Sequence, residues 1–193
     1  FALAQEQASD QIAPEAATPV GSSALSDAGI SAALKAKADG KPVTAKEWMV
    51  VAANPLAVRA GADVLAKGGT AADAMVAVQT VLGLVEPQSS GLGGGAFLVW
   101  YDATTGDITT LDGRETAPLE ATPKLFLDDT GEPLQFFDAV VGGRSVGTPG
   151  TPMLMEEAHR RWGRANWAGL FDDAIALAEN GFEVSPRMAA SIA

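Results

Sequence analysis

Residues Glu86–Pro118 read EPQSSGLGGGAFLVWYDATTGDITTLDGRETAP, and the rest of the chain can be arranged around this stretch. It holds a five-residue run with four glycines, Gly91–Gly95, then two short stretches of strand-forming residues and, directly after Gly113, the arginine Arg114. Glycine permits close backbone approach and positive φ, and the guanidinium fork of arginine matches a carboxylate. The stretch therefore indicates a compact core that presents Arg114 in an anion-binding pocket.

The composition describes a single soluble globular domain. The chain has 193 residues, of which 47% are hydrophobic and 19% charged, enough for one sizeable core. Acidic residues outnumber basic ones by 24 to 13, giving a net charge of −11 without any basic run. Nucleic acid and anionic membranes are therefore poor partners, although loop arginines such as Arg114 and Arg144 can still form a local pocket for an acidic small molecule.

The chain contains no cysteine, which removes disulfides, thiolate nucleophiles and cysteine metal sites. Its one histidine, His159, has no second histidine or cysteine with which to form a metal cluster. We expect no metal and no other cofactor.

The first 42 residues differ in composition from the rest. Phe1–Ala4 contains the small-residue pattern Ala-Leu-Ala that precedes a signal-peptidase cut, and we interpret it as a signal-peptide remnant, with an arbitrary alanine-rich start as the alternative. This interpretation predicts a periplasmic or secreted protein. Residues 5–42 are rich in Ala, Ser, Gln, Asp and Pro and predict a flexible leader, within which Ala28–Ala38 can form a short helix.

Residues 43–193 form the folded segment. The continuous apolar run Trp48–Ala53 predicts a buried strand. Asn54-Pro55 predicts a helix start and Gly68-Gly69 its end. Thr70 and Asp73 then predict a capping box for a buried helix over 71–85, too short to span a membrane.

The second half of this segment begins with a predicted antiparallel pair, Phe97–Tyr101 and Ile108–Leu111. Residues 117–143 are rich in loop signals, and we expect them to wrap the surface. Further helix starts are predicted at Thr151-Pro152, Asn166 and Ser185-Pro186. The last start lies about two turns before the end of the chain, so we expect this chain to be a fragment of a longer protein.

Two short motifs match known sites but lack their context. Gly91, Gly93 and Ala96 have dinucleotide-fingerprint spacing, yet that fingerprint needs a strand before it and a helix after it, the reverse of the predicted order. Ser145 lies in a G-x-S-x-G pattern, but the only histidine, His159, lies fourteen residues after it on a predicted helix, so the base that a nucleophile elbow requires is not expected at Ser145. We expect Ser145 to be a loop residue and His159 to lie on a solvated helix face.

Arg114 is the stronger candidate for function. An arginine after a strand is by default a surface cation or an ion-pair partner, and the adjacent glycine run is what favours a ligand. The acidic pairs Asp128-Asp129 and Asp172-Asp173 are adjacent in sequence, and we assign them no chemistry.

Six motifs occur in one order along about Trp48–Ala193: NPLA from Asn54, GGTAADA from Gly68, EPQSSGLGGG from Glu86, LDGRETAP from Leu111, SVGTPG from Ser145 and GFEVSPR from Gly181. On these motifs the chain resembles the γ-glutamyltransferase family, also called γ-glutamyltranspeptidase or glutathione hydrolase. Several ordered motifs are far more specific than any single one.

The resemblance implies an α+β fold of the N-terminal-nucleophile hydrolase type, an αββα sandwich whose precursor cuts itself into a large and a small subunit. It implies that a threonine at the new N-terminus attacks γ-glutamyl amides such as glutathione, with its own amino group as base. Arg114 is the residue that would hold the α-carboxylate of the substrate. The remainder of the large subunit and the small subunit would be the partners of this segment.

The sequence departs from the complete family pattern because it contains only the leading part of the large subunit. Thr104-Thr105 precedes a glycine in a predicted hairpin loop and is not the nucleophile, so this chain supplies no catalytic residue and is expected to be inactive alone. Gln88 and Thr70 stand where His and Asn are more usual in the family. Two alternatives remain open: a cephalosporin (glutaryl) acylase of the same fold, and a non-catalytic binding protein.

Overall fold

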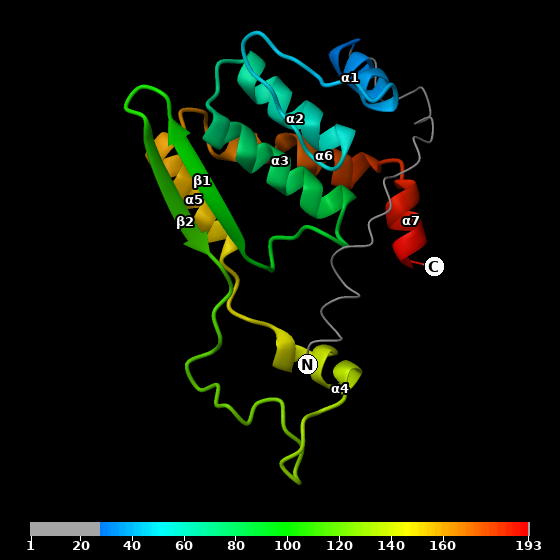
Figure 1. Ribbon diagram of the computed structural model, residues 1–193, viewed down its shortest axis with the longest axis vertical. Coiled ribbons are helices and arrows are strands. Elements are labelled where there is room, and N and C mark those ends of the chain that lie inside the picture. The colour runs from blue at the N-terminus through cyan, green and yellow to red at the C-terminus, as the bar shows by residue number, and fades with distance from the viewer. Residues whose placement is uncertain (1–27, 193) are drawn as a thin grey trace.

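The computed structural model describes residues 28–192 and shows a helical body, a hairpin beside it and a projecting segment (Figure 1). The proposed signal remnant and residues 5–27 of the predicted leader lie outside the described residues. In chain order the elements are α1 (Ala28–Ala38), α2 (Pro55–Ala66), α3 (Ala71–Val85), β1 (Ala96–Asp102), β2 (Asp107–Gly113), α4 (Phe136–Val140), the 3-10 turn η1 (Gly143–Ser145), α5 (Thr151–Trp162), the 3-10 turn η2 (Ala168–Phe171), α6 (Asp172–Asn180) and α7 (Pro186–Ile192). Between residues 28 and 192, none of the helices has the length and apolar character needed to cross a membrane.

Helix α3 is the centre of the helical body. Its small side chains pack on α2 on one side and, through Val76, on Met155 of α5 and Leu170 of η2 on another. Close approach of α2 depends on Gly61, where an added Cβ would lie 2.5 Å from a methyl carbon of Val78. The buried helix predicted over 71–85 is confirmed, and its nearly all-round apolar character follows from this double packing.

The local signals at the ends of α2 and α3 act as the sequence predicts. The Asn54 side chain accepts a hydrogen bond from the Leu56 amide at 3.0 Å, with Pro55 in the first helical position. Gly68 follows α2 with φ of +86°, a conformation that suits glycine. Thr70 and Asp73 form the predicted capping box, in which each side chain accepts a hydrogen bond from the backbone amide of the other residue.

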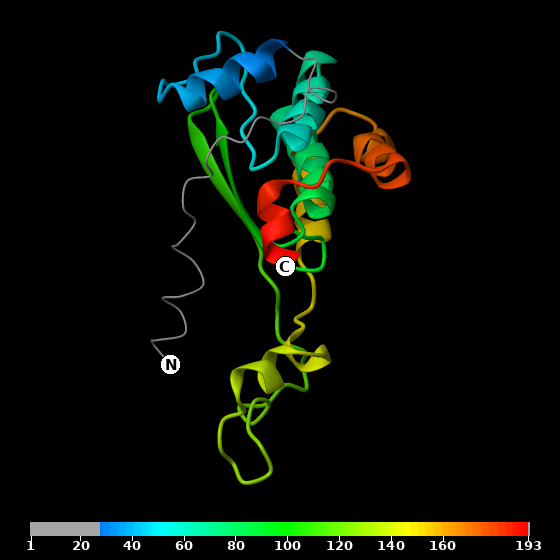
Figure 2. The same cartoon turned by 90° about the vertical axis from the view of Figure 1, so that its right-hand side faces the viewer.

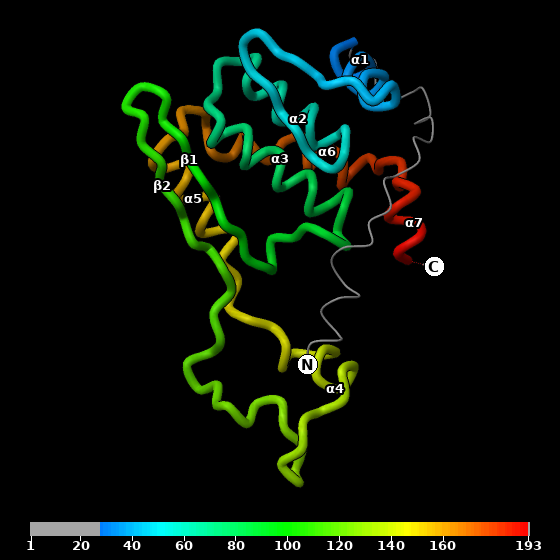
Figure 3. The backbone as a smooth tube through the Cα atoms, in the orientation of Figure 1, coloured from blue at the N-terminus to red at the C-terminus, as the bar shows by residue number. Residues whose placement is uncertain are grey.

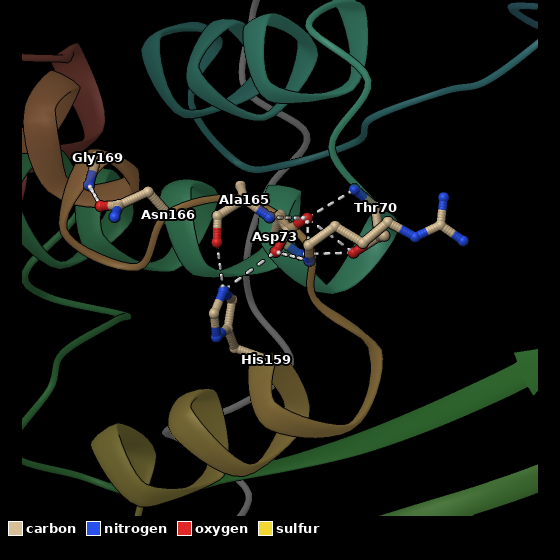
Figure 4. A network of polar contacts seen from close by, with 7 residues as sticks. Thr70, Asp73, His159, Ala165, Asn166 and Gly169 are labelled. Atoms are coloured by element: carbon tan, nitrogen blue, oxygen red, sulfur yellow. Dashed lines mark hydrogen bonds and ion pairs between the residues drawn. The ribbon is translucent and has the colours of Figure 1, made fainter.

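Asp73 does more than cap its own helix. Its buried carboxylate also accepts hydrogen bonds from the amides of Arg164 and Ala165, at 3.1 and 3.2 Å, in the loop that follows α5 (Figure 4). Burial raises the pKa of the Asp73 carboxyl, but the hydrogen bonds from Thr70, Arg164 and Ala165 outweigh it and hold this pKa below the ordinary 3.8. The carboxylate therefore joins two segments far apart in sequence.

His159 belongs to this network, so the solvated position expected for it is wrong. Its Nε2 atom lies 2.9 Å from the carbonyl oxygen of Ala165 and 3.4 Å from Oδ1 of Asp73 (Figure 4). Both neighbours are acceptors, so Nε2 carries the proton. The histidine ring also packs against Trp167, with ring centroids 5.2 Å apart. The charged neighbours in sequence, Glu157 and Arg160, pair with each other on the exposed side of α5.

The hairpin β1–β2 lies against α5, on the opposite side of the helical body from α6 (Figure 2). Its antiparallel register pairs Ala96 with Gly113 and Asp102 with Asp107, which confirms the predicted strands and extends each of them. Trp100 stacks on Trp162 of α5 with ring centroids 4.5 Å apart and planes 4° apart. This face of the hairpin is fixed to α5 by aromatic stacking.

Two predicted elements differ from the structure. Trp48–Ala53 forms no strand and pairs with none in the described part of the chain, and Val51 is 82% exposed. An apolar run becomes a strand only when its backbone groups find a neighbouring strand. The helix predicted to start at Asn166 is divided, because the 3-10 turn η2 precedes α6 and the Asn166 side chain accepts a hydrogen bond from the Gly169 amide.

Residues 117–143 were expected to wrap the surface, and instead they project away from the body (Figure 3). The segment is held by local contacts, such as the Leu127–Pro133 bridge and the hydrogen bonds that Asp128 accepts from Thr130 and Glu132. Its apolar side chains stay exposed, with Phe137 at 75%. Too few apolar contacts reach the body to draw the segment onto it.

We predict that Asp73→Asn destabilises the fold by about 2 kcal/mol, because an amide replaces a charged acceptor of several hydrogen bonds. The folded-state pKa of Asp73 is lowered, so its contribution is present above the unfolded-state pKa and is lost as the pH falls below 3.8 toward the folded-state value. Urea unfolding of both proteins near neutral pH and below pH 3.8 measures the difference, which should shrink in acid.

Asp129→Asn is the matched control. Within residues 28–192 this exposed turn residue makes no hydrogen bond or ion pair with Asp73, His159 or their partners, so the unfolding midpoint should stay unchanged. His159→Gln should cost less than Asp73→Asn, because the histidine bonds to the carbonyl oxygen of Ala165 and only approaches Asp73, whose carboxylate keeps its backbone partners. Equal midpoints for wild type and Asp73→Asn would contradict the assignment.

Candidate functional site

Three loop segments meet at the end of the hairpin, around Arg114. The segment after β2 pairs with the segment before α5 through the Thr116–Thr148 bridge. The carbonyl oxygen of Gly94 accepts hydrogen bonds from the amides of Gly150 and Thr151, at 3.0 and 3.2 Å. The glycine run, the arginine and the start of α5 therefore form one site, although about 60 residues of sequence separate its ends.

Glycines allow these segments to touch. An added Cβ at Gly150 would lie 2.0 Å from the carbonyl oxygen of Gly113, which no side chain can tolerate. Gly95 and Gly147 lie on either side of Glu115, where an added Cβ would come within 2.7 and 2.8 Å of its atoms. Glu115 thus occupies a slot between two glycines from different segments.

The Arg114 side chain is 69% exposed and lines an open pocket of about 430 Å³. Its Nε atom lies 3.0 Å from Oε2 of Glu115, and its backbone amide donates to Oδ1 of Asp112 at 3.0 Å. Within residues 28–192 the outer nitrogens Nη1 and Nη2 make no hydrogen bond or ion pair with the protein. The pocket is lined by Gly93, Arg114, Glu115, Thr116, Ala117, Ser145, Val146 and Gly147.

This geometry suits a carboxylate ligand. The Glu115 carboxylate engages the guanidinium at Nε and restrains its plane, while the edge formed by Nη1 and Nη2 keeps its donors for a bidentate partner. An exposed pair of this kind contributes at most about 1 kcal/mol to stability. The arrangement is therefore better explained as orientation of Arg114 than as a stabilising contact.

Glu115 was missed at the level of sequence. It follows Arg114 directly, and adjacent residues after a strand give no sign that their side chains meet. The signal lies in the glycines at 95 and 147, which leave room for it only once the segments are brought together. A second open hollow lies on the other side of Glu115, lined by Gln79, Ser89, Ser90, Thr151 and the glycine run.

Only part of the glycine run at residues 91–95 is closely packed. Gly95 is crowded by Gly113 and Glu115, whereas a Cβ at Gly91 or Gly93 would meet nothing within 4 Å. The open glycines line the hollows instead. Helix α3 precedes the run and strand β1 follows it, the order that argued against a dinucleotide site.

Ser145 lies in η1, not on a nucleophile elbow. Its hydroxyl lies 2.6 Å from the carbonyl oxygen of Val140 and 3.2 Å from that of Gly142, so its proton is used within the projecting segment. His159 is held by Asp73 and Ala165. The two residues share no contact among the described residues, as expected from the order of the motif.

Comparison of the sequence with protein families and with curated proteins points to the gamma-glutamyltranspeptidase family. A family model described as gamma-glutamyltranspeptidase matches residues 57–193. The chain is 47% identical over 147 residues to a glutathione hydrolase proenzyme of Bacillus subtilis (strain 168), covering 76% of this chain and 25% of that protein. A glutathione hydrolase proenzyme of Pseudomonas aeruginosa is 36% identical over 160 residues, covering 83% of this chain and 27% of the relative. The chain thus spans about a quarter of the length of these relatives.

Solved structures agree with the sequence comparison. The Helicobacter pylori gamma-glutamyltranspeptidase superposes with a TM-score of 0.73 at 38% identity, covering 78% of this chain and 43% of that one. A cephalosporin acylase from Bacillus halodurans superposes with a TM-score of 0.57 at 32% identity, covering 77% and 28%. The expected α+β fold of the N-terminal-nucleophile hydrolases is confirmed, and the described residues contribute helices and one hairpin to it.

We predict that Gly150→Ala disrupts the site, because its new methyl group would overlap the Gly113 carbonyl oxygen. Overpacking of this kind costs about 1 to 3 kcal/mol or more. The thermal midpoint of the protein should fall, and the Thr116–Thr148 contact should be lost in amide hydrogen exchange. Gly143→Ala is the matched control in the same segment, where an added Cβ meets nothing within 4 Å. Equal midpoints for the two variants would show that the segments are not in contact as described.

Proposed function

The chain belongs to the gamma-glutamyltranspeptidase family, and on that premise we propose that the protein containing it is an enzyme that hydrolyses or transfers γ-glutamyl groups, with glutathione as a substrate. The observation that carries the proposal is the guanidinium of Arg114, held at Nε by Glu115 and open at Nη1 and Nη2. Residues 43–193 would form the N-terminal segment of the large subunit.

In this proposal Arg114 binds the α-carboxylate of the γ-glutamyl group. A bidentate contact at the free edge of the guanidinium fixes both the position and the orientation of the substrate. Glu115 keeps the guanidinium plane in place through its contact with Nε, and the glycines at 95 and 147 keep Glu115 in place. The chain's own contribution is therefore binding and orientation rather than bond breaking.

The bond-breaking group would come from other polypeptide of the same precursor. We infer that the precursor cleaves itself and exposes a threonine, whose hydroxyl attacks the γ-glutamyl carbonyl and whose amino group takes the proton. The proenzyme names of the relatives support processing of this kind. The small subunit and the remainder of the large subunit would be the partners of this segment.

We also propose that the protein acts in the periplasm or outside the cell. The support is the small-residue pattern at Phe1–Ala4, together with the leader-like composition that follows it. Recovery of the native protein from the cytoplasm with Phe1–Ala4 still attached to upstream sequence would contradict this part of the proposal.

A second candidate is a glutaryl acylase, favoured by the similarity to the cephalosporin acylase of Bacillus halodurans. Arg114 suits both substrates, because a glutaryl chain and a γ-glutamyl group each end in a carboxylate. They differ in the α-ammonium, which only the γ-glutamyl group carries. Turnover of γ-glutamyl-p-nitroanilide against glutaryl-p-nitroanilide by the processed protein separates the two, and failure to turn over the γ-glutamyl compound would reject the proposed function.

We predict that Arg114→Lys raises KM for γ-glutamyl-p-nitroanilide by about tenfold or more, corresponding to about 1.4 kcal/mol. An ammonium offers a single point of contact and cannot reproduce the bidentate fork. The change in kcat should be smaller, because the carboxylate contact is made in both the ground state and the transition state. Steady-state kinetics on the processed enzyme gives both constants.

Arg144→Lys is the control for this substitution. Arg144 lies in η1 and is exposed, but it does not line the pocket, so KM should stay at the wild-type value. An unchanged KM in Arg114→Lys would remove Arg114 from the substrate site.

A further inference from the structure

The loop between α3 and β1, residues 87–93, forms a wall of the site but has little structure of its own. Pro87, Gln88 and Ser89 are exposed, and Gly91 and Gly93 have open space where a side chain would be. The loop contributes Gly93 to the Arg114 pocket and several residues to the neighbouring hollow. The amides of Ser89 and Ser90 both donate to the carbonyl oxygen of Glu86 at 3.0 Å, so the loop begins with a turn on the end of α3. The rest of its position comes from a few side-chain contacts.

One of these contacts is made by Glu86, the residue at the C-terminal end of α3. Its side chain is 4% exposed, and its Oε1 atom accepts a hydrogen bond from Nδ2 of Asn54 at 3.0 Å. Its Oε2 atom accepts from Nε2 of Gln88 and lies 3.2 Å from Nη1 of Arg187. A buried carboxylate with three donors is satisfied, and each donor comes from a different segment.

Arg187 connects Glu86 to the loop, because its guanidinium contacts both Glu86 and Ser89. While Nη1 reaches Glu86, Nη2 donates to the hydroxyl oxygen of Ser89 at 2.7 Å. The two partners lie on opposite sides of Gln88 in sequence, so the fork spans the first turn of the loop. Arg187 comes from α7, about 100 residues further along the chain, which makes this a tertiary contact and not part of the loop's own folding.

The far part of the loop has separate anchors. Nε2 of Gln79 donates to the hydroxyl oxygen of Ser90 at 2.9 Å, and Gly94 is held by the start of α5. Residues 87–89 lie between Glu86 and these anchors. Among the residues described, Arg187 alone makes a hydrogen bond to them from outside the loop and α3. A lysine could not replace it, because one ammonium cannot lie in both positions.

We propose that Glu86 and Arg187 form a clamp that positions the 87–93 loop as a wall of the substrate pocket, so that both are positioning residues for substrate binding. The proposal rests on the proposed γ-glutamyl function for its kinetic consequence only. Neither residue lines the pocket around Arg114. The clamp holds the part of the loop that contains Pro87 and Ser89, which line the neighbouring hollow, and Gly93 lines both that hollow and the Arg114 pocket. The clamp should therefore affect KM more than kcat.

The test compares Arg187→Gln, Arg187→Lys and the double variant Glu86→Gln/Arg187→Gln in the processed protein. Arg187→Gln leaves the Glu86 carboxylate buried without its cation and should lower the thermal midpoint, whereas the double variant removes both charges and should recover it. In all three, amide hydrogen exchange of residues 87–93 should become faster while that of 74–82 in α3 is unchanged. KM for γ-glutamyl-p-nitroanilide should rise by about fivefold or more, with kcat within about twofold.

Arg160→Gln is the matched control, since it breaks an arginine–carboxylate pair with Glu157 on the exposed face of α5 and should change none of these quantities. The proposal is overturned if the double variant recovers wild-type KM and loop exchange together with its midpoint, because the pair would then only stabilise the fold. It is also overturned if exchange rises equally in 87–93 and 74–82. Hydrogen exchange tests whether Glu86 and Arg187 hold the loop, and it does not require turnover of the γ-glutamyl compound. The clamp can therefore fail while the proposed function stands, or stand while the proposed function fails.

Discussion

The buried carboxylate of Asp73 is the interaction on which the helical body depends. It caps the helix to which it belongs and, through the amides of Arg164 and Ala165, fixes the loop that follows α5. Because α5 carries the hairpin by way of the Trp100–Trp162 stack, the orientation of the hairpin follows from the same carboxylate. Arg114 lies at the end of that hairpin. The position of this exposed arginine therefore depends on the buried carboxylate of Asp73.

At the site around Arg114, the positions of the segments are fixed by steric constraint. Three segments meet there with backbone almost touching backbone, and glycines at 95, 147 and 150 are the reason that they can. The space left between two of them is filled by Glu115, which then holds Arg114 at Nε. The site is thus built by the absence of side chains at a few positions as much as by the presence of charged ones.

The elements whose signals are local could be predicted from sequence. The capping box at Thr70 and Asp73, the glycine end of α2 and the alternating hairpin strands each depend on residues a few positions apart. What could not be predicted depends on distant partners. His159 was misplaced because Asp73 is far from it in sequence, and Trp48–Ala53 was misassigned because an apolar run does not show whether a neighbouring strand exists. Arg114 was found by its motif, but the role of Glu115 needed the glycines of two other segments.

The wide separation of Asp73 from its backbone partners also has a consequence during synthesis. Helices α2 and α3 and the cap at Thr70 are complete as soon as residue 85 has been made, but the amides of Arg164 and Ala165 are about 80 residues away. At the usual rate of translation, about 5 to 20 residues per second, the carboxylate waits roughly 4 to 16 seconds for them. During that interval the apolar sides of α3 that later meet Met155 and Leu170 have no cover from α5 and η2. The order of the chain therefore leaves this side of α3 without its later cover until the residues of α5 and η2 have been made.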